Sequence, residues 1–225
     1  MTFMVIQKYV NLSRLIVVVA FSAIGLSSRG NGLSAKAAET QPGNSGKTFA
    51  DWCREEASLS PEAKHTFEVL LRKSKTTECD AADRKLSSLT ELYLDNNEIS
   101  DIKPLQSLTQ LTELNLSRNE ISDIKPLESL IQLFLLELDN NQINDIKPLA
   151  SLTQLIFLGL SDNKISDIQP LQSLRELDYL SLDNNQISNI KPLQSLTNLN
   201  YLSLGGNLIT PQICPMTKPE SICIW

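Results

Sequence analysis

Residues with the types and spacing needed for catalysis or metal binding are scarce in this chain. The segment 43–48 ends like a phosphate-binding loop, but Gln41 stands where that motif requires its first glycine. His65 is the only histidine, and no nucleophile or second histidine accompanies it, which argues against triads and zinc hydrolase sites. Residues 95–97 lack the glycine and distal glutamate of a calcium-binding EF-hand loop. We therefore expect no catalytic residue, no metal and no cofactor.

The start of the chain has the composition of a secretory signal peptide. Lys8 and Arg14 accompany an uncharged run at 15–26, and Ala35-Lys36-Ala37 has the small residues of a cleavage site. A helix of that run would cover only about 18 Å, less than the roughly 30 Å of a hydrocarbon core. We therefore predict a signal peptide at 1–37 and a linker at 38–47. The expected location is periplasmic, cell-surface or secreted, with no stable membrane insertion after cleavage.

The chain is acidic. Its formal net charge is -6, from 20 Lys and Arg against 26 Asp and Glu. Removing residues 1–37 takes away four basic residues and no acidic ones, so 16 basic and 26 acidic residues remain and the charge becomes -10. An acidic surface repels phosphate backbones, and nucleic acid is therefore not expected as a partner.

One pattern recurs every 22 residues through the middle of the chain. Leucines keep this step in two columns that begin at Leu92 and Leu94, isoleucines in one that begins at Ile99, and prolines in one that begins at Pro104. Asparagines keep it six times: Asn97, Asn119, Asn141, Asn163, Asn185 and Asn207. A shared interval in several columns indicates an internal repeat.

The repeat resembles a known family. LTELYLDNN at residues 89–97 matches the leucine-rich-repeat consensus L-x-x-L-x-L-x-x-N. ISDIKPL at 99–105 is similar to the bacterial internalin-like 22-residue subclass. The resemblance covers residues 86–209, about six units of 22. It implies an α/β solenoid, namely a right-handed leucine-rich-repeat horseshoe with a parallel concave sheet.

The residues of one unit predict the same architecture. Leu92 and Leu94 alternate with polar neighbours, so a short strand should point both leucines inward. Asn97 falls where the chain must turn, and its amide can satisfy buried backbone groups there. Pro104 suits the start of a short helical turn, and one unit has room for little more, so the convex side should be 3₁₀-like. Aspartates are expected to cap these turns: Asp101, Asp123, Asp145 and Asp167.

Both ends of a solenoid need a cover, and the sequence predicts one at each end. Residues 48–85 lack the repeat but contain a capping-box pattern at 48–51 and the N-cap pair Ser60-Pro61, so we expect a helical N-terminal cap. Residues 210–225 should form a C-terminal cap, in which Ile222, Ile224 and Trp225 can cover the last repeat.

The four cysteines fall two in each cap. The caps should lie roughly 30 Å apart across six layers, whereas disulfide-bonded cysteines need Cα atoms within about 7 Å. We therefore predict the disulfides Cys53–Cys79 and Cys214–Cys223, in agreement with an exported protein. Buried free thiols are the alternative. A zinc site is disfavoured because the two pairs cannot meet.

The strand pattern also predicts which side chains line the concave face. Four apolar side chains of neighbouring strands, here named the apolar ladder, should stack in one stripe: Leu135, Phe157, Tyr179 and Tyr201. Small residues of the middle column, such as Gly159 and Ser181, should leave these rings accessible. The expected binding residues are this ladder together with Tyr93, Glu137, Asp139 and Asp183. The competing interpretation is that the rings only stabilise the sheet.

These features predict a non-catalytic, exported, monomeric protein that binds a protein or peptide through its concave face. The acidic residues beside the ladder favour a ligand with basic and apolar groups. One alternative is a structural, envelope-associated repeat protein without a specific partner. Another is an intracellular enzyme regulator, which would require reduced cysteines and an uncleaved N-terminal segment.

Overall fold

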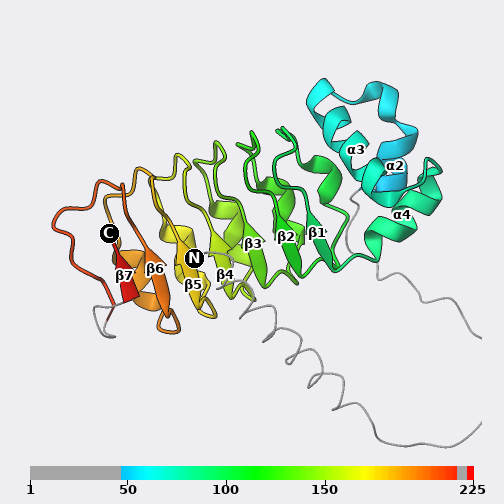
Figure 1. Ribbon diagram of the computed structural model, residues 1–225. Helices are drawn as coiled ribbons and strands as arrows, with labels where there is room; N and C mark the ends of the chain where they lie inside the picture. Colours follow the sequence, from blue (N-terminus) through cyan, green and yellow to red (C-terminus); the bar gives the residue numbers. More distant parts are fainter. Residues whose placement is uncertain (1–46, 217–221) are drawn as a thin grey trace, which may run out of the picture. The chain divides into compact units, whose positions relative to one another are not determined.

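The computed structural model describes residues 47–216 and 222–225, which belong to one compact unit that starts at residue 45 (Figure 1). The predicted signal peptide, 1–37, and all of the predicted linker except Lys47 lie outside the described residues. Within the described part of the chain, no helix has the length and apolar character needed to cross a membrane.

The N-terminal cap is helical, as predicted. It consists of three α-helices and one 3₁₀ turn: α2 (Phe49–Arg54), η1 (Glu56–Ser58), α3 (Pro61–Ser74) and α4 (Cys79–Ser87). The capping box is confirmed, since the Asp51 N–H donates to the Thr48 hydroxyl and the Thr48 N–H donates to the Asp51 carboxylate. Ser60 caps α3, whose first residue is a proline. The last cap helix ends at Ser87, two residues beyond the predicted boundary.

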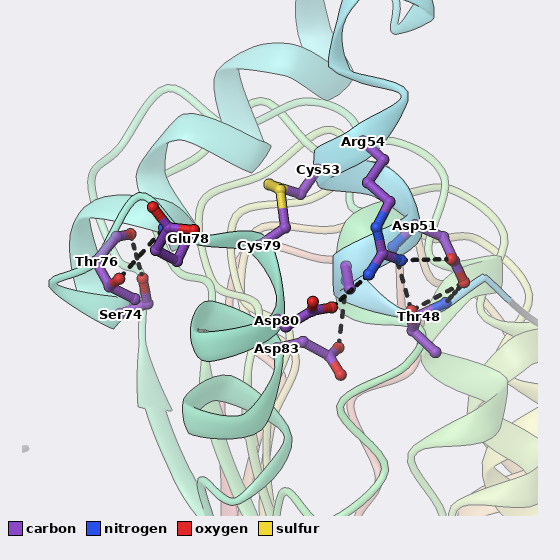
Figure 2. Close-up of a disulfide and its surroundings, with 11 residues drawn as sticks. Thr48, Asp51, Cys53, Arg54, Ser74, Thr76, Glu78, Cys79, Asp80 and Asp83 are labelled. Atoms are coloured by element: carbon purple, nitrogen blue, oxygen red, sulfur yellow. Dashed lines mark hydrogen bonds and ion pairs between the residues drawn. A yellow bond between two sulfur atoms is a disulfide. The ribbon is translucent and has the colours of Figure 1, made fainter.

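A disulfide joins the first and last helices of this cap. Cys53 of α2 is bonded to Cys79 of α4, with 5.6 Å between their Cα atoms. Arg54 lies beside this disulfide and bridges the carboxylates of Asp51 and Asp80 (Figure 2). The predicted pairing is confirmed here and at the other end, where Cys214 and Cys223 are bonded at a Cα separation of 5.8 Å.

His65 contacts the first repeat. Its Nε2 atom lies 2.6 Å from the main-chain oxygen of Asn97, in the first turn of the repeats. The side chain is half-buried between α3 and that turn. The lone histidine therefore helps to join the cap to the solenoid.

The repeats form a parallel sheet whose strands follow one another in chain order (Figure 1). Each repeat contributes three residues: β1 (Glu91–Tyr93), β2 (Glu113–Asn115), β3 (Leu135–Glu137), β4 (Phe157–Gly159), β5 (Tyr179–Ser181) and β6 (Tyr201–Ser203). Residues 22 positions apart are paired in register, for example Leu92 with Leu114. The predicted solenoid with a parallel sheet is confirmed.

The predicted 3₁₀ turns form the opposite side of the solenoid. They are η2 (Lys103–Leu105), η3 (Lys125–Ser129), η4 (Lys147–Ser151), η5 (Gln169–Ser173) and η6 (Lys191–Ser195). Each has proline as its second residue. The expected aspartate caps are present, since Asp101 Oδ1 accepts a hydrogen bond from the Lys103 N–H at 2.9 Å and the next three repeats repeat this contact.

The asparagine column satisfies buried backbone groups of the turns, as predicted, and it also connects each turn to the next. Asn141 donates to the carbonyls of Leu116 and Leu138, each at 3.0 Å, and its oxygen accepts from the Ile121 N–H at 3.0 Å. Asn119, Asn163 and Asn185 make the same contacts in their own layers. These amides satisfy backbone groups that the buried turns would otherwise leave without partners.

The chain adds a seventh strand at its far end. β7 (Cys223–Ile224) pairs parallel with β6, and Ile222 packs against the core beside Met216. The expectation that Ile224 covers the last repeat is wrong, because Ile224 is 45% exposed and is the register partner of Ser203 on the sheet face. Sheet pairing directs the Ile224 side chain away from the core, whereas Trp225 is the next residue, and successive side chains of a strand point to opposite faces.

Candidate protein-binding face

The apolar ladder lies on four consecutive strands, β3 to β6, in exact lateral register. The rings of Phe157 and Tyr179 are parallel with centroids 4.1 Å apart, and those of Tyr179 and Tyr201 are 4.3 Å apart. Leu135 is the register partner of Phe157 on β3. The sequence therefore predicted correctly that these side chains stack in one stripe.

The ladder is less accessible than predicted. The exposed fractions are 4% for Leu135, 4% for Phe157 and 8% for Tyr179, and only Tyr201 at the end of the stripe is half-buried. The strand spacing brings each ring into van der Waals contact with the next, so both faces of Tyr179 are covered by its neighbours. The expectation of freely accessible rings is therefore wrong.

A polar cluster occupies the face at β1 and β2. The Tyr93 hydroxyl donates to the Glu113 carboxylate at 2.9 Å and lies 3.4 Å from Glu91. Tyr93 is 44% exposed, while Glu113 is almost buried. Burial and the hydrogen bond with Glu113 raise the pKa of the Tyr93 hydroxyl, so this group stays a neutral donor. The cluster presents an aromatic ring with an adjacent negative charge.

Glu137 stands where the polar cluster meets the ladder. Its carboxylate accepts a hydrogen bond from the Asn115 amide at 2.6 Å. Burial, with smaller contributions from the charges of Asp139 and Asp95, raises its pKa to about 7. A carboxyl group of this kind gains or loses its charge near neutral pH, so the charge of the face depends on pH and on what binds it.

Asp139 and Asp183 are positioned by glycines and main-chain donors on the next strand. Asp139 Oδ1 accepts from the Ser161 N–H at 2.6 Å, and a Cβ at Gly159 would approach the Asp139 carboxylate to 2.9 Å. Asp183 Oδ1 accepts from the Gly205 N–H at 2.7 Å. Both carboxylates are therefore anchored within the sheet. Burial raises the pKa of Asp139 to about 6, although the Ser161 hydrogen bond opposes this.

The structure brings all eight predicted binding residues onto one face of the sheet, but it divides them by role. Tyr93 offers open surface, Glu137 offers an adjustable charge, and the inner ladder residues and two aspartates have structural partners. Sequence reasoning missed the part played by Glu113 and by the two glycines. Their contacts run between strands 22 residues apart, and the 22-residue step is the only sequence feature that points to them. Among the described residues, no group of three His, Cys, Asp or Glu side chains is placed to hold a metal ion.

Comparison with known proteins agrees with this geometry. A family model described as leucine-rich repeats (two copies) matches residues 87–129, 131–173 and 175–212, more than half of the chain. The chain belongs to the leucine-rich-repeat family. No curated protein matches the sequence.

Solved structures of bacterial leucine-rich-repeat proteins have the same fold. An internalin of Listeria monocytogenes, inlF, is 41% identical over 58% of this chain and 40% of its own, with a TM-score of 0.53. Internalin C2 of the same species is 36% identical over 63% of this chain and 72% of its own, with a TM-score of 0.52. A leucine-rich-repeat protein of Leptospira interrogans is 32% identical over 57% and 34% of the two chains, with a TM-score of 0.54. The chain thus spans less than half the length of the first and third of these proteins.

Proposed function

We propose that this protein is an exported, non-catalytic binding module whose sheet face holds a protein or peptide ligand with basic and apolar groups. The observation that carries the proposal is the juxtaposition of acidic and aromatic side chains on one face of a parallel sheet. Tyr93 presents a half-open ring beside Glu113, and Glu137 presents a carboxyl group between this ring and the apolar ladder. Aromatic anchors and complementary charge are the features by which protein interfaces gain affinity and specificity.

Export is supported by the disulfides and by the N-terminal sequence. Both predicted pairs of cysteines are bonded, with Cα separations of 5.6 and 5.8 Å, and structural disulfides persist in oxidising compartments. The charged start, apolar run and small residues before position 38 fit cleavage after Ala37. The proposed location is therefore periplasmic, cell-surface or secreted.

A structural, envelope-associated role is the second candidate, and the burial of the ladder favours it. Stacked rings on neighbouring strands stabilise a sheet by roughly 0.5–1.5 kcal/mol per pair without any ligand. Removing inner ladder residues would therefore confuse loss of folding with loss of binding. A discriminating experiment has to alter a position of the face outside the ladder.

The test uses charge reversal on the two sides of the solenoid. Glu137→Lys reverses charge on the sheet face, and Glu128→Lys makes the same change on the exposed surface of η3. Each variant is compared with the natural chain in capture from the exported protein fraction, after circular dichroism has confirmed folding. Binding lost in Glu137→Lys but kept in Glu128→Lys supports the proposal. Equal capture by all three chains, or none by any, rejects the sheet face as the binding surface.

A further inference from the structure

Ser117, which directly follows strand β2 on the sheet face, has a hydroxyl without a partner. Its side chain is only 9% exposed, and its Oγ atom makes no hydrogen bond among the described residues. The side chain belongs to the sheet face, because it follows Asn115 by two positions and alternates with fully buried Leu116. A buried hydroxyl without a hydrogen bond is unfavourable, so this one points to a partner from outside the chain.

The equivalent serine two repeats later shows what this hydroxyl lacks. The Ser161 hydroxyl is hydrogen-bonded to the hydroxyl of Ser181, 20 residues further along the chain. The residue 20 positions after Ser117 is Glu137, whose carboxylate instead accepts a hydrogen bond from the Asn115 amide at 2.6 Å. Ser117 therefore lies beside a carboxylate that is bonded elsewhere, at the place where Ser161 has a hydroxyl as its partner.

Two carboxylates flank this hydroxyl, and neither is paired with a cation of this chain. On one side, Asp95 follows β1 in the same column, and the adjacent Asn96 N–H donates to the Ser117 carbonyl at 3.0 Å. Asp95 is exposed, and its carboxylate makes no hydrogen bond or ion pair among the described residues. Glu137 of β3 lies on the other side. Burial is the main cause of its raised pKa, and the charges of Asp139 and Asp95 add to it, so these carboxylates lie within electrostatic reach of one another.

The spacing of the two carboxylates favours a guanidinium as their partner. Neighbouring strands lie about 4.8 Å apart, so the main chains of β1 and β3 are roughly 10 Å apart on either side of Ser117. A guanidinium is planar and carries donors along more than one edge, so it can bridge two carboxylates and also donate to a hydroxyl between them. The ammonium group of lysine is a compact point charge and suits this arrangement less well.

We propose that Asp95, Ser117 and Glu137, here named the arginine site, bind an arginine side chain of the protein ligand. The guanidinium donates to both carboxylates and to the Ser117 hydroxyl, which thereby gains the partner that it lacks. Asp95 is exposed and held by no bond of its side chain, so it can move to admit the arginine. This inference rests on the proposed function for the source of the arginine, and it narrows the basic groups of that ligand to a guanidinium over β1 to β3.

The test titrates the natural chain, as its host produces it, with N-acetyl-arginine amide and follows the main-chain amide signals by NMR. N-acetyl-citrulline amide is a neutral probe of nearly the same shape, and N-acetyl-lysine amide is a compact cation. Asp95→Asn removes one carboxylate, and Ser117→Ala removes the hydroxyl. Both variants should fold, because neither side chain has a hydrogen bond to lose. Glu128→Gln, on the exposed surface of η3, is the matched control.

The arginine probe is expected to shift the signals of residues around Ser117. It should bind at least about fivefold more weakly to Asp95→Asn and to Ser117→Ala than to the natural chain and Glu128→Gln. The lysine probe should bind more weakly than the arginine probe, and the citrulline probe should not bind. The absence of shifts near Ser117, unchanged binding by either site variant, or equal binding of the lysine or citrulline probe would overturn the arginine site.

Failure of the arginine site can be told apart from failure of the proposed function, which the capture experiment with Glu137→Lys tests. If the arginine probe does not bind near Ser117 while Glu137→Lys still loses its partner, the arginine site is wrong and the proposed function stands. If the probe binds as expected while no chain captures a partner, the arginine site stands as a guanidinium site and the proposed function is wrong.

Discussion

Removing one asparagine from the middle of the column should destabilise the protein far more than removing the first one. In Asn141→Ala the buried Ile121 N–H loses the only hydrogen bond that it makes among the described residues. The carbonyls of Leu116 and Leu138 keep one asparagine donor each, from Asn119 and Asn163. The damage is therefore one unpaired donor and two lost bonds of 3.0 Å to carbonyls that remain satisfied. A longer bond of 3.3 Å to the Asp139 carbonyl, which keeps the Arg118 N–H as a donor, is lost as well.

The magnitude follows from these contacts. An unpaired buried N–H costs about 1–3 kcal/mol, and each lost bond contributes about 1 kcal/mol. Asn141→Ala should lower the free energy of unfolding by about 3–5 kcal/mol. Asn97 is the matched control, because its amide donates to one carbonyl only, that of Asp95 at 2.9 Å. Asn97→Ala should therefore cost about 1 kcal/mol or less.

Urea denaturation followed by far-UV circular dichroism measures both variants against the natural chain. Unfolding of a repeat array is cooperative only while neighbouring repeats stay coupled, so the curve of Asn141→Ala should be checked for a second transition. Equal losses in Asn97→Ala and Asn141→Ala would refute the reasoning, because the column would then act through each turn alone and not between layers.

Three further perturbations have defined outcomes. Arg118 has a positive φ of 59° in a column that otherwise holds Asn, Asp or Gly. Arg118→Asn should therefore raise the free energy of unfolding, measured in urea melts, by about 0.5–1 kcal/mol. The control Arg118→Lys should leave the free energy of unfolding unchanged. Burial raises the pKa of Glu137 to about 7; its folded form binds a proton more tightly than the unfolded chain, so this contribution to stability is lost as pH rises from about 4 through 7. Glu137→Gln should therefore gain melting temperature relative to the natural chain at pH 8 but not at pH 4, and a constant difference would contradict this. Cys53→Ala with Cys79→Ala removes a disulfide between residues 26 apart in sequence and should lower the free energy of unfolding by about 3–4 kcal/mol. Cys214→Ala with Cys223→Ala removes one between residues 9 apart and should lower it by about 2–3 kcal/mol. A larger loss of stability from the second pair, measured by calorimetry, would refute this ranking.

The repeat made most of the fold predictable. Residues that recur every 22 positions occupy equivalent places in successive layers. The strands, the 3₁₀ turns, the aspartate caps and the asparagine turns could therefore be predicted from this step. The disulfide pairing followed because six layers separate the two caps. These inferences needed only local patterns repeated at known spacing.

The features that sequence did not predict depend on packing between segments. The stacking of Phe157 and Tyr179 was foreseen, but the degree of burial depends on how closely the rings approach, which no column reveals. His65 meets Asn97 through the docking of α3 on the first turn. Likewise, the sequence places Ile224 in the C-terminal cap but does not state that it lies on a strand and turns outward.

The most direct test of the central claim, that the sheet face holds a protein ligand, is site-specific photo-crosslinking in the cells that produce the protein. A photoreactive phenylalanine replaces Tyr93 or Tyr201 on the sheet face, and in the control it replaces the exposed Gln172 of η5. The account predicts that a partner protein is cross-linked from Tyr93 and Tyr201 but not from Gln172. A partner cross-linked only from Gln172, or none from either face position in folded protein, would contradict it.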